Sequence, residues 1–222
     1  MVRRFVIVTY SKFKPAIFLQ IMKTLFFKTP IFYLIATPSV VGRSYGQTLP
    51  ELSNKNASDQ AKALYKYLLD IRGKVLSGQM VSNFGSFDEL KYIYETTGKQ
   101  PAIRGMDLID SSKNKDEIRF AKKWWKKGGI PTVMWHWGAP GKGDGNRNSQ
   151  KFIDIDKCFE KGTPEYEAFW AELDQKARLL KKLQRAHIPV LWRPFHELNG
   201  NWFWWGKQGP EKFKRLWITM YN

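Results

Sequence analysis

The strongest constraint on the fold is a repeated alternation of amphipathic helical segments with short apolar runs. Four apolar runs span residues 74–80, 102–108, 130–137 and 188–195. Strands that are apolar along most of their length are typical of parallel sheets buried on both faces, in which helices provide the crossovers. The sequence therefore predicts an α/β fold with four βα units in one parallel sheet.

Capping signals place helices around these strands. Ser58, Asn114 and Thr163 are predicted N-caps, because their side chains accept hydrogen bonds from free backbone amides, and Pro164 strengthens the third signal. A capping box over residues 86–89 predicts another helix start. Gly209-Pro210 opens a last helix. Helical spacing predicts these inward positions: Ala61, Leu64, Tyr65, Leu68, Leu90, Ile93, Tyr94, Ile118, Ala121, Trp125, Tyr166, Phe169, Trp170, Leu173, Leu180, Leu183, Phe213, Leu216, Trp217 and Met220.

The amino terminus has a different composition from the rest. Residues 1–50 hold seven of the 37 basic residues and none of the 20 acidic ones. From Met22 a short basic region precedes an apolar stretch over 29–42, and small residues follow at 44–46, which is the layout of an export signal. The apolar stretch is shorter than the roughly 20 residues that a membrane helix needs, so we expect no stable membrane anchor.

We therefore expect three regions and a secreted or periplasmic location. They are a leader over 1–46, with a signal peptide over 22–46 and an upstream extension over 1–21, a linker over 47–57, and a partial catalytic domain over 58–222. A closed (β/α)₈ barrel usually takes about 250 residues. The βα units thus belong either to a small open sheet or to the first half of such a barrel. Unpaired strand edges would then favour self-association of the half-barrel.

The formal charge of +17 raises nucleic acid or an anionic membrane as a partner. Outside the leader, however, the basic residues fall in helical blocks, which we interpret as solvated outer faces. A nucleic-acid binder is accordingly the weakest hypothesis, and we expect no nucleic-acid partner. The single cysteine cannot form an internal disulfide, and no Cys/His cluster has zinc spacing. The basic blocks contain Lys122, Lys123, Lys126, Lys127, Lys176, Arg178, Lys181 and Lys182.

Candidate site residues follow the third and fourth strands, where sites form in both architectures. His136 ends the third strand, and Arg193, His196 and Glu197 end the fourth. A period of two would put Arg193 and Glu197 on one strand face. The following loop holds Trp202, Trp204 and Trp205, and indole faces beside a carboxylate suit a sugar cleft.

Two interpretations of Glu197 remain open at the level of residue chemistry. In an aromatic setting it would resist ionisation and could donate a proton to a glycosidic oxygen. Alternatively, it forms a buried structural ion pair with Arg193. His136 and His196 could likewise be hydrogen-bonded structural histidines.

Two other patterns are weaker. No second histidine follows His196-Glu197 at helical spacing, which argues against a zinc-peptidase site. The glycine-rich segment 138–145 is similar to a phosphate loop, but Gly143 follows Lys142 where Ser or Thr is required, and we expect no helix directly after the segment. We interpret it as a flexible active-site loop.

The fourth-strand motif resembles the acid/base segment of glycoside hydrolase family 26, whose best-known members are endo-β-1,4-mannanases. Over 192–206 it reads Trp-Arg-Pro-Phe-His-Glu-Leu-Asn-Gly-Asn-Trp-Phe-Trp-Trp-Gly. Segments at 77–79, 104–107 and 134–137 are similar to that family's segments in the same order. The resemblance covers roughly residues 58–222 and identifies the amino-terminal part of the catalytic domain.

The resemblance implies a (β/α)₈ barrel and retaining hydrolysis of β-mannosidic bonds in mannan-type polysaccharides, without a cofactor. Glu197 matches the proton donor and later general base. His196 matches a supporting histidine, Arg193 an orienting arginine, and His136 and Trp202 sugar contacts. Retention needs a second carboxylate as nucleophile.

The family supplies this nucleophile from strand seven, which we expect to be missing from this chain. The resemblance gives Asp107, at the end of the second strand, a structural or cleft-lining role. The principal hypothesis is thus a β-mannanase that lacks its nucleophile in this sequence. The alternative is a non-catalytic carbohydrate-binding remnant.

Overall fold

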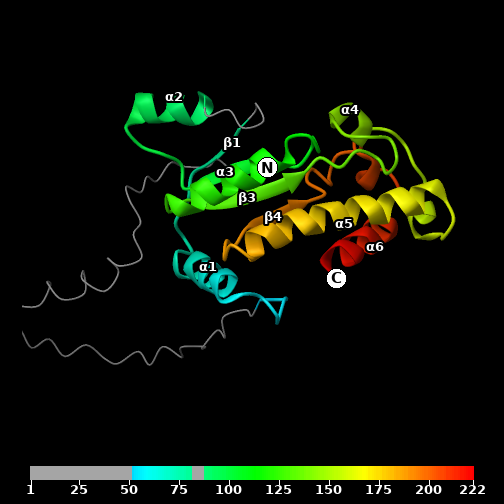
Figure 1. The fold of residues 1–222 in the computed structure, drawn as a ribbon, viewed down its shortest axis with the longest axis horizontal. Coiled ribbons are helices and arrows are strands. Elements are labelled where there is room, and N and C mark those ends of the chain that lie inside the picture. Colours follow the sequence, from blue (N-terminus) through cyan, green and yellow to red (C-terminus); the bar gives the residue numbers. More distant parts are fainter. Residues whose placement is uncertain (1–51, 82–87) are drawn as a thin grey trace, which may run out of the picture.

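A computed structural model describes residues 52–81 and 88–222, and the predicted leader over 1–46 lies outside these ranges. In the described part, helices alternate with four strands (Figure 1). The elements are α1 (Asp59–Asp70), β1 (Gly78–Met80), α2 (Asp88–Thr97), β2 (Ile103–Asp107), α3 (Asn114–Lys126), β3 (Ile130–Trp135), α4 (Asn146–Ser149), the 3₁₀ helix η2 (Ile155–Phe159), α5 (Pro164–Gln184), β4 (Leu191–Pro194), the 3₁₀ helix η3 (Trp204–Gly206) and α6 (Pro210–Tyr221).

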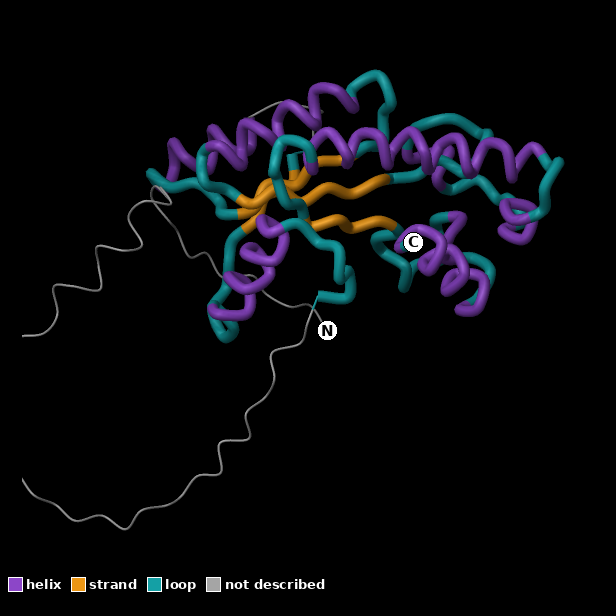
Figure 2. The backbone as a smooth tube through the Cα atoms, turned by 60° about the horizontal axis from the view of Figure 1, so that its bottom comes forward, coloured by secondary structure: helices purple, strands orange, loops and turns teal. Residues whose placement is uncertain are grey.

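The strands form one parallel sheet in the order β1-β2-β3-β4, which confirms the predicted α/β class. Helices α3 and α5 run together along one side of the sheet (Figure 2). Strand β2 is buried along most of its length and so is β3, as expected for strands covered on both faces. The carboxyl ends of β2, β3 and β4 therefore lie next to one another at one edge.

The strands are shorter than the predicted apolar runs. The difference matters most in β4, which ends at Pro194 instead of Phe195. Phe195 has a φ of 48°, outside the extended region, and its ring is buried. The prediction that Arg193 and Glu197 share a strand face is therefore wrong, because the period of two stops where the backbone leaves the sheet.

Two of the predicted helix caps are confirmed. The Ser58 side chain accepts from the Ala61 amide at 3.3 Å, and the Thr163 side chain accepts from the Tyr166 amide at 3.2 Å. Asn114 is not a cap but the first helical residue, and it is buried. Its amide is oriented inward, where it can donate to the Asp110 carbonyl at 3.1 Å. Of the predicted capping box, Ser86 lies outside the described residues.

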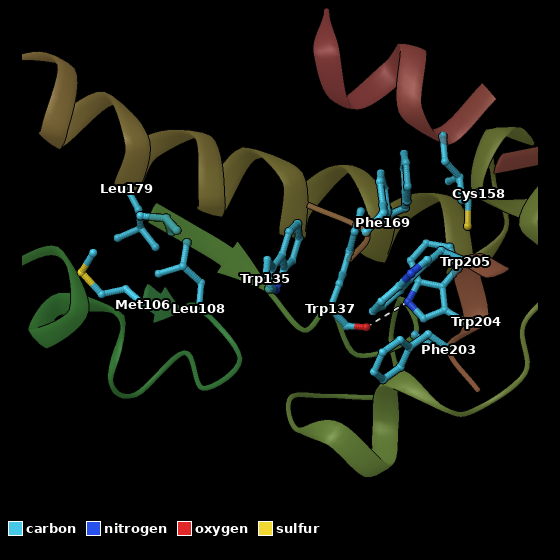
Figure 3. Packing of buried hydrophobic residues seen from close by; sticks show 14 of the residues in the cluster. Met106, Leu108, Trp135, Trp137, Cys158, Phe169, Leu179, Phe203, Trp204 and Trp205 are labelled. Atoms are coloured by element: carbon cyan, nitrogen blue, oxygen red, sulfur yellow. Dashed lines mark hydrogen bonds between the residues drawn. The ribbon is translucent and has the colours of Figure 1, made fainter. Parts of the chain in front are cut away.

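One aromatic-rich core joins the sheet to α3, α5 and α6 (Figure 3). Nine of the twenty predicted inward positions lie in it or against it, whereas Tyr94, Trp170 and Trp217 are exposed. In α3, Trp125 is partly buried against this core, whereas Trp124 is buried in a separate small cluster with Val81 and Leu90. No helix in the described ranges is both long and apolar enough to cross a membrane.

The basic blocks are solvated faces with one exception. Seven of the eight basic residues in them are exposed, as predicted, but Lys176 is only 3% exposed. It lies on the inward face of α5, where its ammonium donates to the Ser111 hydroxyl at 3.2 Å and sits 5.1 Å from the centre of the Trp135 ring. Polar partners and an aromatic face thus replace the water that a lysine normally keeps.

Candidate active site

Two histidines meet where β3 and β4 end. His136 directly follows β3 and His196 lies two residues beyond β4, so the pairing of these neighbouring strands brings them together. Their Nε2 atoms are 2.7 Å apart, and the rings are packed edge to face. The structure thus joins two predicted site residues that are 60 positions apart in the sequence.

Asp107, the last residue of β2, holds His136 from the other side. Its Oδ1 accepts from the His136 backbone amide at 3.0 Å, and its Oδ2 lies 2.5 Å from His136 Nδ1. Sequence reasoning missed this contact. The pairing of β2 with β3 could have indicated the contact, because Asp107 lies opposite Met134, only two residues before His136.

His196 is enclosed by aromatic rings. It is 7% exposed and packs against Phe203 and Trp205, whose indole donates to the His196 carbonyl at 3.1 Å. Burial lowers the pKa of His196 to about 4, and the charge of the nearby Arg193 guanidinium acts in the same direction. His196 is therefore a neutral imidazole near neutral pH.

Glu197 is exposed, and this differs from the aromatic burial we expected. Its Oε2 accepts from the Trp202 indole at 2.9 Å, and Trp202 is itself 46% exposed. Trp204 and Trp205 instead turn into the core, where both are fully buried. The expected desolvation of Glu197 is therefore absent among the described residues, although the hydrogen bond from Trp202 does orient its carboxylate.

Arg193 does not pair with Glu197. Its side chain is exposed and donates to the Met134 sulfur at 2.8 Å, and no ion pair in the described ranges links it to Glu197. The interpretation of a buried structural Arg193–Glu197 pair is therefore wrong. Since β4 ends at Pro194, the two side chains no longer share a face.

The glycine-rich segment 138–145 is fastened to its surroundings at several points. The Gly141 amide donates to Glu172 at 3.2 Å, and a Cβ on Gly138 would lie only 1.9 Å from the Gly143 carbonyl oxygen. The expectation that no helix follows directly is wrong, because α4 begins at Asn146. The turn closes through the Asn148 amide, which donates to the Gly145 carbonyl at 2.9 Å.

The described site therefore presents one exposed carboxylate, an indole beside it and a buried pair of histidines at the carboxyl edge of a parallel sheet. Four βα units with such an edge are compatible with part of a (β/α)₈ barrel, in which sites lie at the carboxyl ends of the strands. Within the described ranges, no three His, Cys, Asp or Glu residues gather in a way that could hold a metal ion.

The chain belongs to Glycosyl hydrolase family 26, whose sequence pattern matches residues 53–222. It is 38% identical over 189 residues to mannan endo-1,4-beta-mannosidase B of Piromyces sp, covering 78% of this chain and 33% of that protein.

Solved structures show the same relationship. GH26A from Muricauda sp. MAR_2010_75 matches with a TM-score of 0.69 and 34% identity, covering 76% of this chain and 58% of that one. A β-mannanase from a symbiotic protist of the termite Reticulitermes speratus, complexed with gluco-manno-oligosaccharide, has a TM-score of 0.64 and 32% identity over 75% and 57% of the two chains. The fold is that of the (β/α)₈ barrel family, and this chain spans a third to three fifths of these relatives.

Proposed function

We propose that this chain is the amino-terminal part of the catalytic domain of a retaining endo-β-1,4-mannanase, with Glu197 as its general acid/base. The observation that carries the proposal is the position of Glu197, exposed at the carboxyl edge of the sheet with its carboxylate fixed by the Trp202 indole. An oriented carboxyl group in reach of solvent can protonate a glycosidic oxygen and later activate water.

The neighbouring residues have supporting roles in this proposal. Trp202 offers an exposed ring face to a sugar, and its N–H holds Glu197. His136 and Arg193 contact the substrate, and His196 supports the site from below as a buried neutral imidazole. Retention requires a nucleophilic carboxylate about 5–5.5 Å from the acid/base group. We expect that group on a seventh strand, whereas the described sheet has four.

Mannan-type polysaccharide is the substrate that the relatives favour. The relative from Piromyces sp is named a mannan endo-1,4-beta-mannosidase, and the β-mannanase from a symbiotic termite protist was solved with a gluco-manno-oligosaccharide. We infer that the present protein acts on β-1,4-linked mannose polymers. We also infer export, to the cell exterior or the periplasm, from the layout of residues 22–46.

Glu197→Gln, made in a full-length version of the protein that includes the expected seventh strand, tests the catalytic assignment. The amide keeps the shape of the side chain but can neither donate an acidic proton nor activate water, so release of reducing ends from mannan should fall by about 10²–10⁴-fold. Glu211→Gln, an exposed glutamate on α6, is the control and should leave the rate unchanged. Equal hydrolysis by the Glu197→Gln variant and the unmodified protein would refute the assignment.

A non-catalytic carbohydrate-binding role is the second candidate. It is favoured by the four-stranded described sheet, since the expected nucleophile is on a later strand. Binding would then depend on Trp202, because Trp204 and Trp205 are buried. Retention of mannohexaose on this chain without any bond cleavage, lost in Trp202→Ala, would support binding over catalysis.

A further inference from the structure

A continuous hydrogen-bonded chain crosses the ends of three strands. It runs from Asp107 at the end of β2, through His136 after β3, to His196 after β4. The side chains of Asp107 and His136 are 10% and 18% exposed, and His196 is 7% exposed, so water has little access to the contacts. In such a setting each contact must pair a donor with an acceptor.

The position of each proton follows from Asp107. Its two oxygens accept from the backbone amide and from Nδ1 of His136, so Nδ1 carries the proton. In a neutral ring Nε2 of His136 is then an acceptor. The Nε2 atom of His196, 2.7 Å away, must therefore be the donor.

His196 Nδ1 is left as a bare acceptor at the end of this chain. It is buried and has no hydrogen-bond partner among the described residues. A buried acceptor without a donor costs free energy, so a group at the other end of the three hydrogen-bonded residues must favour this arrangement over its reverse. The fixed end of the chain is the Asp107 carboxylate, which cannot act as a donor when ionised.

We propose that Asp107 is a positioning residue that fixes the tautomers of both His136 and His196. It acts on His196 only through His136, so its influence passes from the end of β2 to the end of β3 and then to the end of β4. The consequence is that His196, next to Glu197 in the sequence, presents a lone pair and not an N–H at Nδ1. Any role of this lone pair in sugar hydrolysis rests on the proposed function. The assignment of the two tautomers does not.

Other charged groups around these three hydrogen-bonded side chains do not fix a tautomer. Lys176 on α5 and Glu117 on α3 influence Asp107 only electrostatically, and Arg193 and Glu197 do the same to His196. Among the described residues, none of these four groups is hydrogen-bonded to an imidazole of the pair. Asp107 is thus the residue whose replacement should change the proton positions.

Asp107→Asn should reverse both tautomers. The His136 backbone amide requires an acceptor, so the new side chain must turn its oxygen there and its NH₂ group toward Nδ1. Nδ1 of His136 then has to accept, its proton moves to Nε2, and Nε2 of His196 becomes the acceptor. His196 would consequently carry its proton on Nδ1.

The experiment is ¹⁵N NMR of the 222-residue protein labelled at histidine, near neutral pH. The chain has three histidines, and exposed His187 serves as an internal reference. Each ring nitrogen is correlated with the carbon-bound protons of its ring, and these protons are then correlated with the backbone of the same histidine. We expect protonated Nδ1 in His136 and protonated Nε2 in His196, and the reverse in Asp107→Asn.

Asp110→Asn is the matched control. Asp110 lies three residues further on and accepts from Ser112, not from a histidine, so both tautomers should stay as in the unmodified protein. Protonated Nε2 in His136 of the unmodified protein would overturn the proposal even if Asp107→Asn fails to fold. Unchanged tautomers in a folded Asp107→Asn variant would overturn it as well.

The outcome is separable from that of the proposed function. The NMR measurement contains no sugar, so loss of mannan hydrolysis or binding cannot produce or hide the expected pattern. A confirmed reversal of the tautomers in a protein that does not act on mannan would retain the role of Asp107 and reject the β-mannanase assignment.

Discussion

Unusual backbone geometry surrounds the candidate acid/base residue. Phe195 and Glu197 have positive φ values of 48° and 54°, on either side of buried His196. This conformation turns the phenylalanine ring into the core and leaves the Glu197 carboxylate outside. Non-glycine residues in the left-handed region are strained, and such strain is often found at functional sites.

Substitution of Glu197 should reveal this strain in the stability of the protein. We expect Glu197→Gly to be more stable than Glu197→Ala by about 1 kcal/mol, because glycine adopts positive φ without a Cβ clash. At Gln175, exposed within α5, the order should reverse, since alanine is the better helix former. Urea unfolding of the four variants measures both differences, and the same order at both sites would contradict the strain argument.

At the scale of elements, α3 is packed against the sheet through a buried carboxylate. Glu117 is 4% exposed, and burial raises its pKa to about 7. The charge of Arg104 opposes this shift, whereas Asp107 and Asp116 add to it. The native state therefore holds a proton on Glu117 that the unfolded chain loses near its ordinary pKa of 4.5.

Glu117 should therefore destabilise the protein as the pH rises from 5 to 8. Since the native state binds more protons in this window, the free energy of unfolding falls with pH. Relative to the unmodified protein, Glu117→Gln should gain on the order of 2 kcal/mol between these pH values. Exposed Glu167→Gln on α5 should show no such trend. A pH-independent difference for Glu117→Gln in chemical unfolding would refute this assignment.

Helix α5 fastens the end of β3 through Glu172. This carboxylate accepts from the Trp137 indole and from the Gly141 amide, and burial raises its pKa. The Trp137 carbonyl in turn accepts from the Trp204 indole at 2.9 Å, as Figure 3 shows. One helix thus ties the loop after β3 to the tryptophan-rich loop after β4.

Loss of the Glu172 acceptor should weaken this region. In Glu172→Leu the buried Trp137 N–H has no acceptor, and we expect the free energy of unfolding to fall by about 2 kcal/mol. Glu172→Gln retains a carbonyl oxygen and should lose less. Thermal unfolding followed by circular dichroism compares the two, and a leucine variant as stable as the glutamine variant would contradict the role of the hydrogen bond.

At the scale of the whole molecule, the described sheet has two edges. Strands β1 and β4 each pair with one described neighbour, so their other sides have unpaired backbone groups among the described residues. Such edges favour pairing with another chain.

We expect the 222-residue chain to self-associate as its concentration rises. Pairing of two sheet edges would satisfy backbone groups that otherwise face water. Light scattering over a dilution series should give an apparent mass that increases from the monomer value of 26.0 kDa. A constant mass of 26.0 kDa at every concentration would contradict the expectation.

Local patterns determined much of the fold. The alternation of helices and strands, the caps at Ser58 and Thr163 and the clustering of His136, His196 and Glu197 at one sheet edge follow from residues close in sequence and from the rules of parallel sheets. Periodicity and capping depend on neighbours within a few positions, and the residues that resemble a family are themselves sequence.

Tertiary packing decided what short-range patterns do not encode. Lys176 is buried by Ser111 and Trp135, far from it in sequence, and Trp204 is inside while Trp202 is outside because the Trp137 carbonyl offers an indole acceptor 67 positions away. The end of β4 and the link from Asp107 to the histidines depend in the same way on contacts across strands. Burial and proton positions are properties of these distant partners, so the sequence set the elements and the tertiary structure set the chemistry of the site.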